Sequence, residues 1–244
     1  MSLSIRELRE IHDLQRVADL FDEVWKPEPG NPPVPLDLMV AFAHAGCYVA
    51  GAFDGQELVG ASVGFLGAGA SLHSHVTGVR AAGRGVGYAL KRHQREWCLE
   101  RGLETIKWTF DPLVRRNAHF NLTKLGARPE EYLEDFYGEL RDELNAGDRS
   151  DRLLAVWRLT EEAGARPVPG GAGVVLDEDG RAHEADTPVV LVATPRDIEA
   201  LRRREPERAR AWRPAMRQAL GGLMATGGKV VGFTDAGHYV VVRG

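Results

Sequence analysis

Residues 76–89 read VTGVRAAGRGVGYA, a short apolar strand followed by a glycine-rich turn and the first residues of an amphipathic helix. Gly83, Gly85 and Gly87 lack a Cβ atom, so the backbone can approach a ligand closely and direct successive N–H groups toward it. The helix predicted at 88–101 adds the positive end of its dipole and its unpaired first-turn N–H groups. This stretch therefore predicts a cradle for a phosphate or pyrophosphate.

Two nucleotide-binding motifs with a similar layout do not fit this stretch. The P-loop ends in Gly-Lys-Ser/Thr, whereas Gly87 is followed here by Tyr88 and Ala89. The dinucleotide fingerprint needs a third glycine at a fixed spacing, and that glycine is missing after Gly83 and Gly85. The turn alone therefore indicates an anion site without identifying the ligand.

The forty residues after the helix narrow this prediction. They contain the strand LETIKWTFD at 103–111, a loop with RRNA at 115–118, a short helix HFNLTK at 119–124 and the pair Leu125-Gly126. Together with the glycine turn, this order resembles motifs A and B of the GNAT acyltransferase superfamily, whose Arg/Gln-x-x-Gly-x-Gly/Ala turn binds the pyrophosphate of acyl-CoA. The resemblance covers roughly residues 1–160. It implies an α/β (α+β) fold with a mixed twisted sheet flanked by helices.

The resemblance assigns the pyrophosphate contacts in one of two registers. Arg84 to Ala89 matches the family pattern letter for letter, whereas counting back from the helix end puts Ala82 at the Arg/Gln position. Either register implies that acetyl-CoA, or another acyl-CoA, binds as co-substrate to Gly83, Arg84, Gly85, Val86, Gly87, Tyr88 and Ala89.

Other acyl-CoA contacts follow from the same resemblance. The backbone N–H of Val79 is expected to point at the thioester carbonyl, and Asn117 and Asn121 are expected to hydrogen-bond the pantetheine arm. Motif B departs from the family pattern, because its usual tyrosine is Leu122 here and the aromatic residue after the glycine is Ala127. The general acid of the superfamily is therefore absent from its usual position.

Acyl transfer to an amine needs a base, a donor to the carbonyl oxygen and a proton for the departing thiolate. His75 is one candidate base, because a histidine has a suitable pKa and His73 shares its strand face. Asp111 is the other, because it ends a strand where ligands collect in open sheets. Candidates for the proton donor are Tyr132, then Tyr137 and His119, or the solvent.

Composition limits the remaining function classes. The chain has 244 residues, of which 43% are hydrophobic, enough for a substantial core. Its two cysteines are too few for a disulfide framework or a four-ligand zinc site, and no metal is expected. A net charge of −4 argues against general nucleic-acid binding. The start, MSLSIRELREIHDL, is interpreted as a charged helix and not a signal peptide, and no apolar run is long enough to span a membrane, so a cytoplasmic location is expected.

Hydrophobic periodicity predicts the order of elements. Helices are expected at 11–24 and 36–45, a hairpin turns at Asp54-Gly55, and strands at 103–111 and in RPEEYLEDFYGEL and DRLLAVWRL follow. The segment 161–186 is rich in Gly, Pro and acidic residues, which is typical of a linker or an edge hairpin. After it, a strand, helices at 196–204 and 206–220, and a closing hairpin predict a small α/β subdomain. The predicted organisation is an acyltransferase domain at 1–160, the linker, and a docked subdomain at 187–244.

The second of the C-terminal helices carries an arginine face. Arg210, Arg213 and Arg217 lie close together across two turns, which suits a carboxylate or phosphate but also suits a solvated helix paired with nearby glutamates. We expect Arg213 and Arg217 to hold a charged group of the acceptor.

The sequence as a whole predicts an acyl-CoA-dependent N-acyltransferase, in the simplest case one that transfers acetyl from acetyl-CoA to a small-molecule amine by direct attack. The missing motif-B tyrosine keeps a non-catalytic acyl-CoA sensor as the alternative. A nucleic-acid module that uses the arginine helix is a third, weaker interpretation. No membrane partner is expected, and a homodimer is left open.

Overall fold

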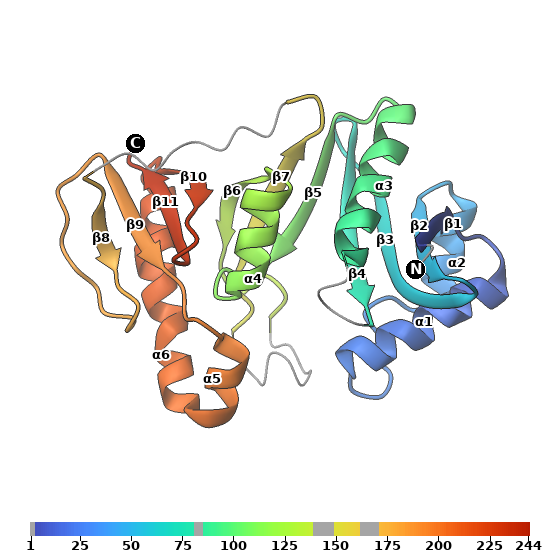
Figure 1. Cartoon of the computed structure of the whole chain (residues 1–244), viewed down its shortest axis with the longest axis horizontal. Coiled ribbons are helices and arrows are strands. Elements are labelled where there is room, and N and C mark those ends of the chain that lie inside the picture. The colour runs from blue at the N-terminus through green and yellow to red at the C-terminus, as the bar shows by residue number, and fades with distance from the viewer. Residues whose placement is uncertain (1–2, 81–84, 139–148, 162–170) are drawn as a thin grey trace. The chain divides into compact units, whose positions relative to one another are not determined.

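A computed structural model describes residues 3–80, 85–138, 149–161 and 171–244 of the chain (Figure 1). By their internal contacts, these residues divide into two compact units, one up to Trp108 and the other from Thr109 onward. The predicted domain boundary near residue 160 stays a prediction, while the contacts group residues 109–138 and 149–161 with the C-terminal segment.

The first unit holds, in its described part, five strands, the last of which continues into the second unit, and three helices. In chain order they are β1 (Leu3–Glu7), α1 (Ile11–Trp25), α2 (Leu36–His44), β2 (Tyr48–Asp54), β3 (Glu57–Gly67), β4 (Ser71–Val79), α3 (Val86–Glu100) and β5 (Thr105–Phe110). The predicted helices at 11–24 and 36–45, the hairpin at Asp54-Gly55 and the helix after the glycine turn are confirmed.

Apolar side chains cover both faces of this part of the sheet, because successive residues of a strand point to opposite sides. Leu14 and Phe21 of α1 and Met39 of α2 belong to one buried cluster with Val63 of β3. Val86 and Leu90 of α3 form a second cluster with Ala52 of β2. Helix α3 thus packs on one set of strand side chains, and α1 and α2 pack on the other.

The prediction of a helix from the first residues is wrong for residues 3–7. They form β1, which pairs antiparallel with β2 from Leu3–Asp54 to Glu7–Ala50. The strand is short and carries Arg6, whose guanidinium lies 4.6 Å from the ring centre of Phe53. Pairing with a neighbouring strand outweighs the local helical pattern here, and the helix begins only at Ile11.

Strand β4 contains a β-bulge. It pairs with β3 at Gly64–Ser74 and then at Val63–Val76, so His75 is one residue more than the pairing needs. On its other edge, β4 pairs in parallel with β5 from Ser71–Thr105 to His73–Lys107. The bulge at Ser74 and His75 therefore lies just past the last residue that β4 pairs with β5.

The second unit contains the remaining elements. They are α4 (Arg115–Ala118), the π-helical turn η1 (His119–Lys124), β6 (Arg128–Leu133), β7 (Arg152–Arg158), β8 (Gly173–Leu176), β9 (Val189–Ala193), α5 (Ile198–Arg204), α6 (Pro206–Met216), η2 (Arg217–Gly221), α7 (Gly222–Ala225), β10 (Lys229–Phe233) and β11 (His238–Val242).

Backbone hydrogen bonds order the described strands into two sheets. The larger is mixed, with seven strands in the order β1-β2-β3-β4-β5-β7-β6, and the smaller has four strands in the order β10-β11-β9-β8. The closing hairpin β10–β11 and the strand β9 confirm the predicted C-terminal elements, and β8 joins β9 in parallel. Within the described ranges, no helix is both long enough and apolar enough to cross a membrane.

Candidate functional site

The glycine turn leads directly into the first turn of α3. Gly85 precedes the helix with φ +76°, a left-handed conformation that favours glycine, and a glycine offers no side chain to cap the helix. The N–H of Ala89 is the first to bond within the helix, to the carbonyl of Gly85 at 2.9 Å. The N–H groups of the three preceding residues have no intrahelical acceptor, which is the arrangement that binds anions. The first turn of α3 contains no acidic residue.

Among the described residues, the space around Gly85 and Gly87 is open. A Cβ atom added at Gly87 would meet only Val79 Cγ1, at 3.9 Å, and one added at Gly85 would meet no described atom within 4 Å. Packing among the described residues therefore does not require glycine at position 87. Gly83 and Arg84 lie outside the described residues, so the choice between the Arg84 and Ala82 registers stays open.

The end of β4 lies against this turn. A Cβ atom at Gly60 would fall 2.8 Å from Val86 Cγ1 and 3.1 Å from Val79 Cγ1, so the start of α3 packs closely on β3 and β4. Arg80 donates its N–H to the carbonyl of Val59 in β3 at 3.0 Å. Because neighbouring amides of a strand point to opposite edges, the N–H of Val79 faces away from β3. This is the orientation that the predicted role of Val79 needs.

His75 occupies the bulge on the face that packs against α1 and α2. Its Nε2 lies 3.2 Å from the carbonyl oxygen of Pro33, and its ring centre is 6.4 Å from that of His73. Since a carbonyl only accepts, this contact places the proton of neutral His75 on Nε2 and leaves Nδ1 as a basic site. His73 stacks on Phe65 at 4.8 Å, and burial, helped by the nearby His75 and Lys91, lowers the pKa of His73.

A buried lysine that the sequence analysis missed lies on the other face of β4. Lys91 of α3 is 6% exposed, and its Nζ donates to Ser74 Oγ at 2.8 Å and to Gln94 Oε1 at 3.3 Å. Its Nζ also lies 4.0 Å from the ring centre of Trp108. A signal for it exists in the sequence, because Lys91 and Gln94 fall on the same helical face as the apolar Leu90 and Trp97.

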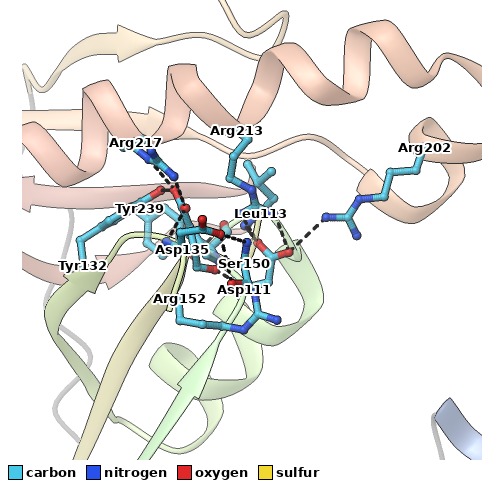
Figure 2. Close-up of polar contacts among 12 residues, drawn as sticks. Asp111, Leu113, Tyr132, Asp135, Ser150, Arg152, Arg202, Arg213, Arg217 and Tyr239 are labelled. Carbon is cyan, nitrogen blue, oxygen red and sulfur yellow. Dashed lines mark hydrogen bonds and ion pairs between the residues drawn. The ribbon is translucent and has the colours of Figure 1, made fainter. Parts of the chain in front are cut away.

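Asp111 is held inside the second unit by arginines (Figure 2). Arg213 of α6 donates to both of its carboxylate oxygens, Arg202 of α5 approaches one of them at 3.2 Å, and the N–H of Leu113 donates to the other at 2.9 Å. Burial alone would raise the pKa of Asp111, but the hydrogen bonds and charge of Arg213 outweigh it and lower the pKa to about 2. These contacts favour a structural role for the Asp111 carboxylate over its predicted role as the general base.

Tyr132 and Arg217, both labelled in Figure 2, bond to a second buried carboxylate, that of Asp151. The hydroxyl of Tyr132 donates to Asp151 at 2.8 Å, and Arg217 donates to both carboxylate oxygens at 3.0 and 2.5 Å. Burial, helped by the charge of Asp151, raises the pKa of Tyr132, so the phenol keeps its proton. Arg213 and Arg217, which were expected to hold the acceptor, are thus each paired with an aspartate.

Asn117 and Asn121 do not lie in one regular α-helix. Asn117 belongs to α4, whereas Asn121 is buried in η1, where the chain widens into a π-helical turn. Leu122, at the position of the motif-B tyrosine, is buried as well. The predicted contacts of Asn117 and Asn121 with pantetheine stay predictions.

The arginines of α4 have partners within the second unit. Arg115 donates to Thr194 through Nε and Nη2, and Arg116 pairs with Glu199 of α5 at 2.5 and 2.7 Å.

In the part of the chain that the structure describes, no group of three or more His, Cys, Asp or Glu side chains could hold a metal ion.

The structure therefore brings the predicted residues together in two groups. Val79, the described cradle residues and His75 belong to the first unit, together with the unexpected Lys91. In the second unit, Asp111 pairs with Arg213, while Tyr132 and Arg217 both bond to Asp151.

Comparison with solved structures identifies the fold. The chain is similar to the ribosomal-protein-S18-alanine N-acetyltransferase from Escherichia coli, with 12% identity and a TM-score of 0.52 over 66% of this chain and 96% of that one. It is similar to an aminoglycoside 6'-acetyltransferase type Ii, with 17% identity and a TM-score of 0.52 over 65% and 99%. A putative acetyltransferase from Salmonella typhimurium, crystallised with acetyl-CoA, has 13% identity and a TM-score of 0.51 over 68% and 99%.

These matches show that the chain has the GNAT fold, as its motifs predicted. The chain matches no protein-family model and no curated protein. At this level of identity the likeness concerns the fold, and the neighbours are covered almost whole while about a third of this chain lies outside each match.

Proposed function

We propose that the chain is an acyl-CoA-dependent N-acyltransferase that transfers an acetyl group from acetyl-CoA to the amine of a small molecule. The observation that carries the proposal is the open first turn of α3. Glycine inside a helix costs about 0.5–1 kcal/mol relative to alanine, yet no neighbouring atom of the described residues requires it at position 87. A close approach of the pyrophosphate to that backbone supplies the reason.

The chain's own groups would act as follows. The N–H groups of Val86, Gly87 and Tyr88 bind the pyrophosphate, and the N–H of Val79 donates to the thioester carbonyl, where negative charge develops. Because His75 and Val79 are four residues apart on β4, about 13 Å along a strand, Nδ1 of His75 would accept the proton that the attacking amine loses through a chain of water molecules. Two neighbours of the same fold fit this chemistry, one crystallised with acetyl-CoA and one named for a small-molecule amine acceptor.

Asp111 and Tyr132 have a structural role in this proposal and not a catalytic one. Both oxygens of Asp111 and the hydroxyl of Tyr132 are engaged by buried partners. We assign them to holding β5, β6 and the helical segment α6–η2 together. Asp111 acts through Arg213, and Tyr132 acts through Asp151, which Arg217 also binds. The location is proposed to be the cytoplasm.

The test combines binding with turnover. Calorimetry measures the affinity of the cradle for CoA. Release of free thiol from acetyl-CoA in the presence of a panel of small amines measures transfer. We expect the protein both to bind CoA and to release thiol. Tight CoA binding without thiol release would favour the alternative function, a non-catalytic acyl-CoA sensor, which is suggested by Leu122 in place of the motif-B tyrosine. Absence of CoA binding would refute both.

A further inference from the structure

Arg152, the first residue of β7, is a nearly buried arginine that has no carboxylate partner among the described residues. It is 8% exposed, and its one hydrogen bond in the described part of the chain runs from Nη1 to the backbone carbonyl of Asp151, at 2.9 Å. The other three arginines labelled in Figure 2 each donate to a buried aspartate, either Asp111 or Asp151. Since buried charges in proteins are normally paired, Arg152 indicates a place for an anion that the chain itself does not supply.

Asp111 has no acceptor position left for Arg152. Each of its carboxylate oxygens already accepts two hydrogen bonds, which come from the N–H of Leu113, from Arg213 and from Arg202. Burial is the main cause that lowers the pKa of Arg152, and the charges of Arg213 and Arg202 lower it further. The charge of Asp111 acts in the opposite direction without offsetting them. The surroundings therefore disfavour the charge of Arg152, and a bound anion would compensate for this.

One edge of the Arg152 guanidinium is available to a ligand. Since Nη1 donates to Asp151, the edge formed by Nε and Nη2 carries two parallel N–H groups that make no hydrogen bond within the described residues. Neither nitrogen is among the described polar atoms that are both unpartnered and fully buried, so both still reach solvent. Two parallel N–H groups match the two oxygens of a carboxylate.

An exposed aromatic pair adjoins this guanidinium. Cζ of Arg152 lies over the ring of Tyr137, 5.4 Å from its centre, and the Tyr137 ring packs edge-on against Phe136 at 4.7 Å. Tyr137 is 42% exposed and Phe136 is 47% exposed. The hydroxyl of Tyr137 bonds to that of Thr109, 2.9 Å away, and the backbone N–H of Tyr137 donates to Ser150. The pair therefore offers a fixed apolar surface beside the cation.

We propose that the Nε–Nη2 edge of Arg152 binds the carboxylate of a small organic acid whose apolar part lies on Tyr137 and Phe136. These three residues belong to the second unit and take no part in the proposed acyl-CoA cradle. A phosphate has more oxygens and more charge than one guanidinium edge satisfies. A neutral ligand would leave the charge of Arg152 without a partner.

Calorimetry on the full chain tests the site with 3-phenylpropanoate and with 3-phenylpropanamide as its neutral match. The acid should bind saturably, and the amide should bind about tenfold more weakly or not at all, because it carries no charge. Arg152→Met should weaken binding of the acid about tenfold or more. Arg158→Met removes an exposed arginine of the same strand that pairs with Glu130, and as the matched control it should leave the affinity unchanged.

Two further variants separate the parts of the site. Arg152→Lys keeps the charge but loses the two parallel N–H groups, so it should also weaken binding of the acid, and it carries the test if Arg152→Met does not fold. Tyr137→Ala should weaken 3-phenylpropanoate more than butanoate, because only 3-phenylpropanoate has a ring to place on the aromatic pair.

Stability distinguishes a ligand site from a structural role. Without ligand, the urea midpoint of Arg152→Met should stay at or above that of the wild type, since the charge that is removed has no carboxylate partner among the described residues. A midpoint well below that of the wild type, together with unchanged affinity for the acid, would make Arg152 a structural residue and overturn the inference.

Thiol release from acetyl-CoA identifies the source of the carboxylate. If the amine acceptor carries it, Arg152→Met should raise the KM for amines that bear a carboxylate and leave the KM for their amide analogues unchanged. If a separate organic acid carries it, both KM values should stay unchanged while 3-phenylpropanoate still binds to the wild type.

The inference is overturned if no carboxylate binds saturably, if the amide or inorganic phosphate binds as tightly as the acid, or if the Arg152 variants keep the full affinity. A chain that binds CoA but transfers no acyl group would overturn the proposed function alone, because the titrations with the acid contain no acyl-CoA.

Discussion

Arg213 and Asp111 are 102 residues apart in the chain, yet their side chains form two parallel hydrogen bonds of 2.8 and 2.9 Å. The side chains are only 3% and 8% exposed. A bidentate pair of this kind is geometrically specific, and breaking it strands a charge in the interior.

Arg213→Met is accordingly expected to destabilise the second unit by about 3–5 kcal/mol, because it leaves Asp111 buried without its main partner. Urea unfolding followed by circular dichroism measures the change. Arg210→Met, which removes an exposed arginine paired with Glu207, should change stability by less than about 0.5 kcal/mol. If Arg213→Met instead raised only the KM for the acceptor at unchanged stability, the arginine would bind substrate as the sequence suggested.

Gly87→Ala and Gly87→Val separate folding from ligand binding. Space is available for the new Cβ atom, so Gly87→Ala should stabilise the chain by about 0.5–1 kcal/mol. Gly87→Val should nonetheless weaken CoA at least tenfold, about 1.4 kcal/mol, as measured by calorimetry. Gly222→Ala, in another helix with open space around the glycine, is the control and should leave CoA affinity unchanged. If a folded Gly87→Val variant kept the full affinity for CoA, the assignment of the pyrophosphate site to this turn would be wrong.

Stability should depend on pH through Lys91. The pKa of Lys91 is about 7 in the folded chain and 10.5 for an ordinary lysine, so the unfolded state binds more protons between these values. The free energy of unfolding should therefore rise with pH in this window, by up to about 1.4 kcal/mol per pH unit. Urea midpoints at two pH values inside this window measure the rise.

The contribution of Lys91 is the difference between the pH dependence of the free energy of unfolding in the wild type and that in the Lys91→Met variant. Cys98 opposes the trend at higher pH, because burial raises the pKa of its thiol to about 12. An identical pH slope in the variant would show that Lys91 is not responsible.

Tyr132→Phe distinguishes a structural phenol from a catalytic one. The variant removes a hydrogen bond to the charged Asp151, which is expected to cost about 1.5–3 kcal/mol of stability. Turnover measured well below the unfolding transition should stay within a few-fold of the wild type. A loss of about 100-fold or more in kcat together with a changed basic limb would make Tyr132 the proton donor after all.

His75→Gln tests the base. The acid limb of the kcat/KM profile should disappear in this variant, because glutamine cannot take the proton of the amine, while CoA affinity stays unchanged. Asp111→Asn is the informative comparison. If the limb survives in His75→Gln and is lost in Asp111→Asn, the base belongs to the second unit.

Most elements could be predicted from the sequence because their patterns are local. The periodicity of α1, the Asp54-Gly55 turn and the glycine turn before α3 each depend on a few consecutive residues. β1 could not be predicted in this way, because its short charged segment becomes a strand only by pairing with β2, which follows two helices later in the chain.

The site was less predictable for the same reason. The residue types of Asp111 and Arg213 suggested chemistry, but their mutual pairing is set by the tertiary fold. The burial of Lys91 depends on Ser74 and Trp108, neither of which adjoins it in sequence. Periodicity can show that a lysine falls on an apolar helix face, yet only the packing shows what surrounds its ammonium group.

Because of its bulge, β4 can lose one residue at His75 more easily than one elsewhere in the strand. If His75 were deleted, Val76 would follow Ser74 directly, and the pairs Gly64–Ser74, Val63–Val76 and Ser62–Thr77 would form an uninterrupted ladder. A deletion in β4 away from the bulge would turn every later side chain to the opposite face. The sheet therefore does not need His75 to keep its register, and a chain that lacks this one residue is expected to keep β3 and β4 paired on both sides of the former bulge.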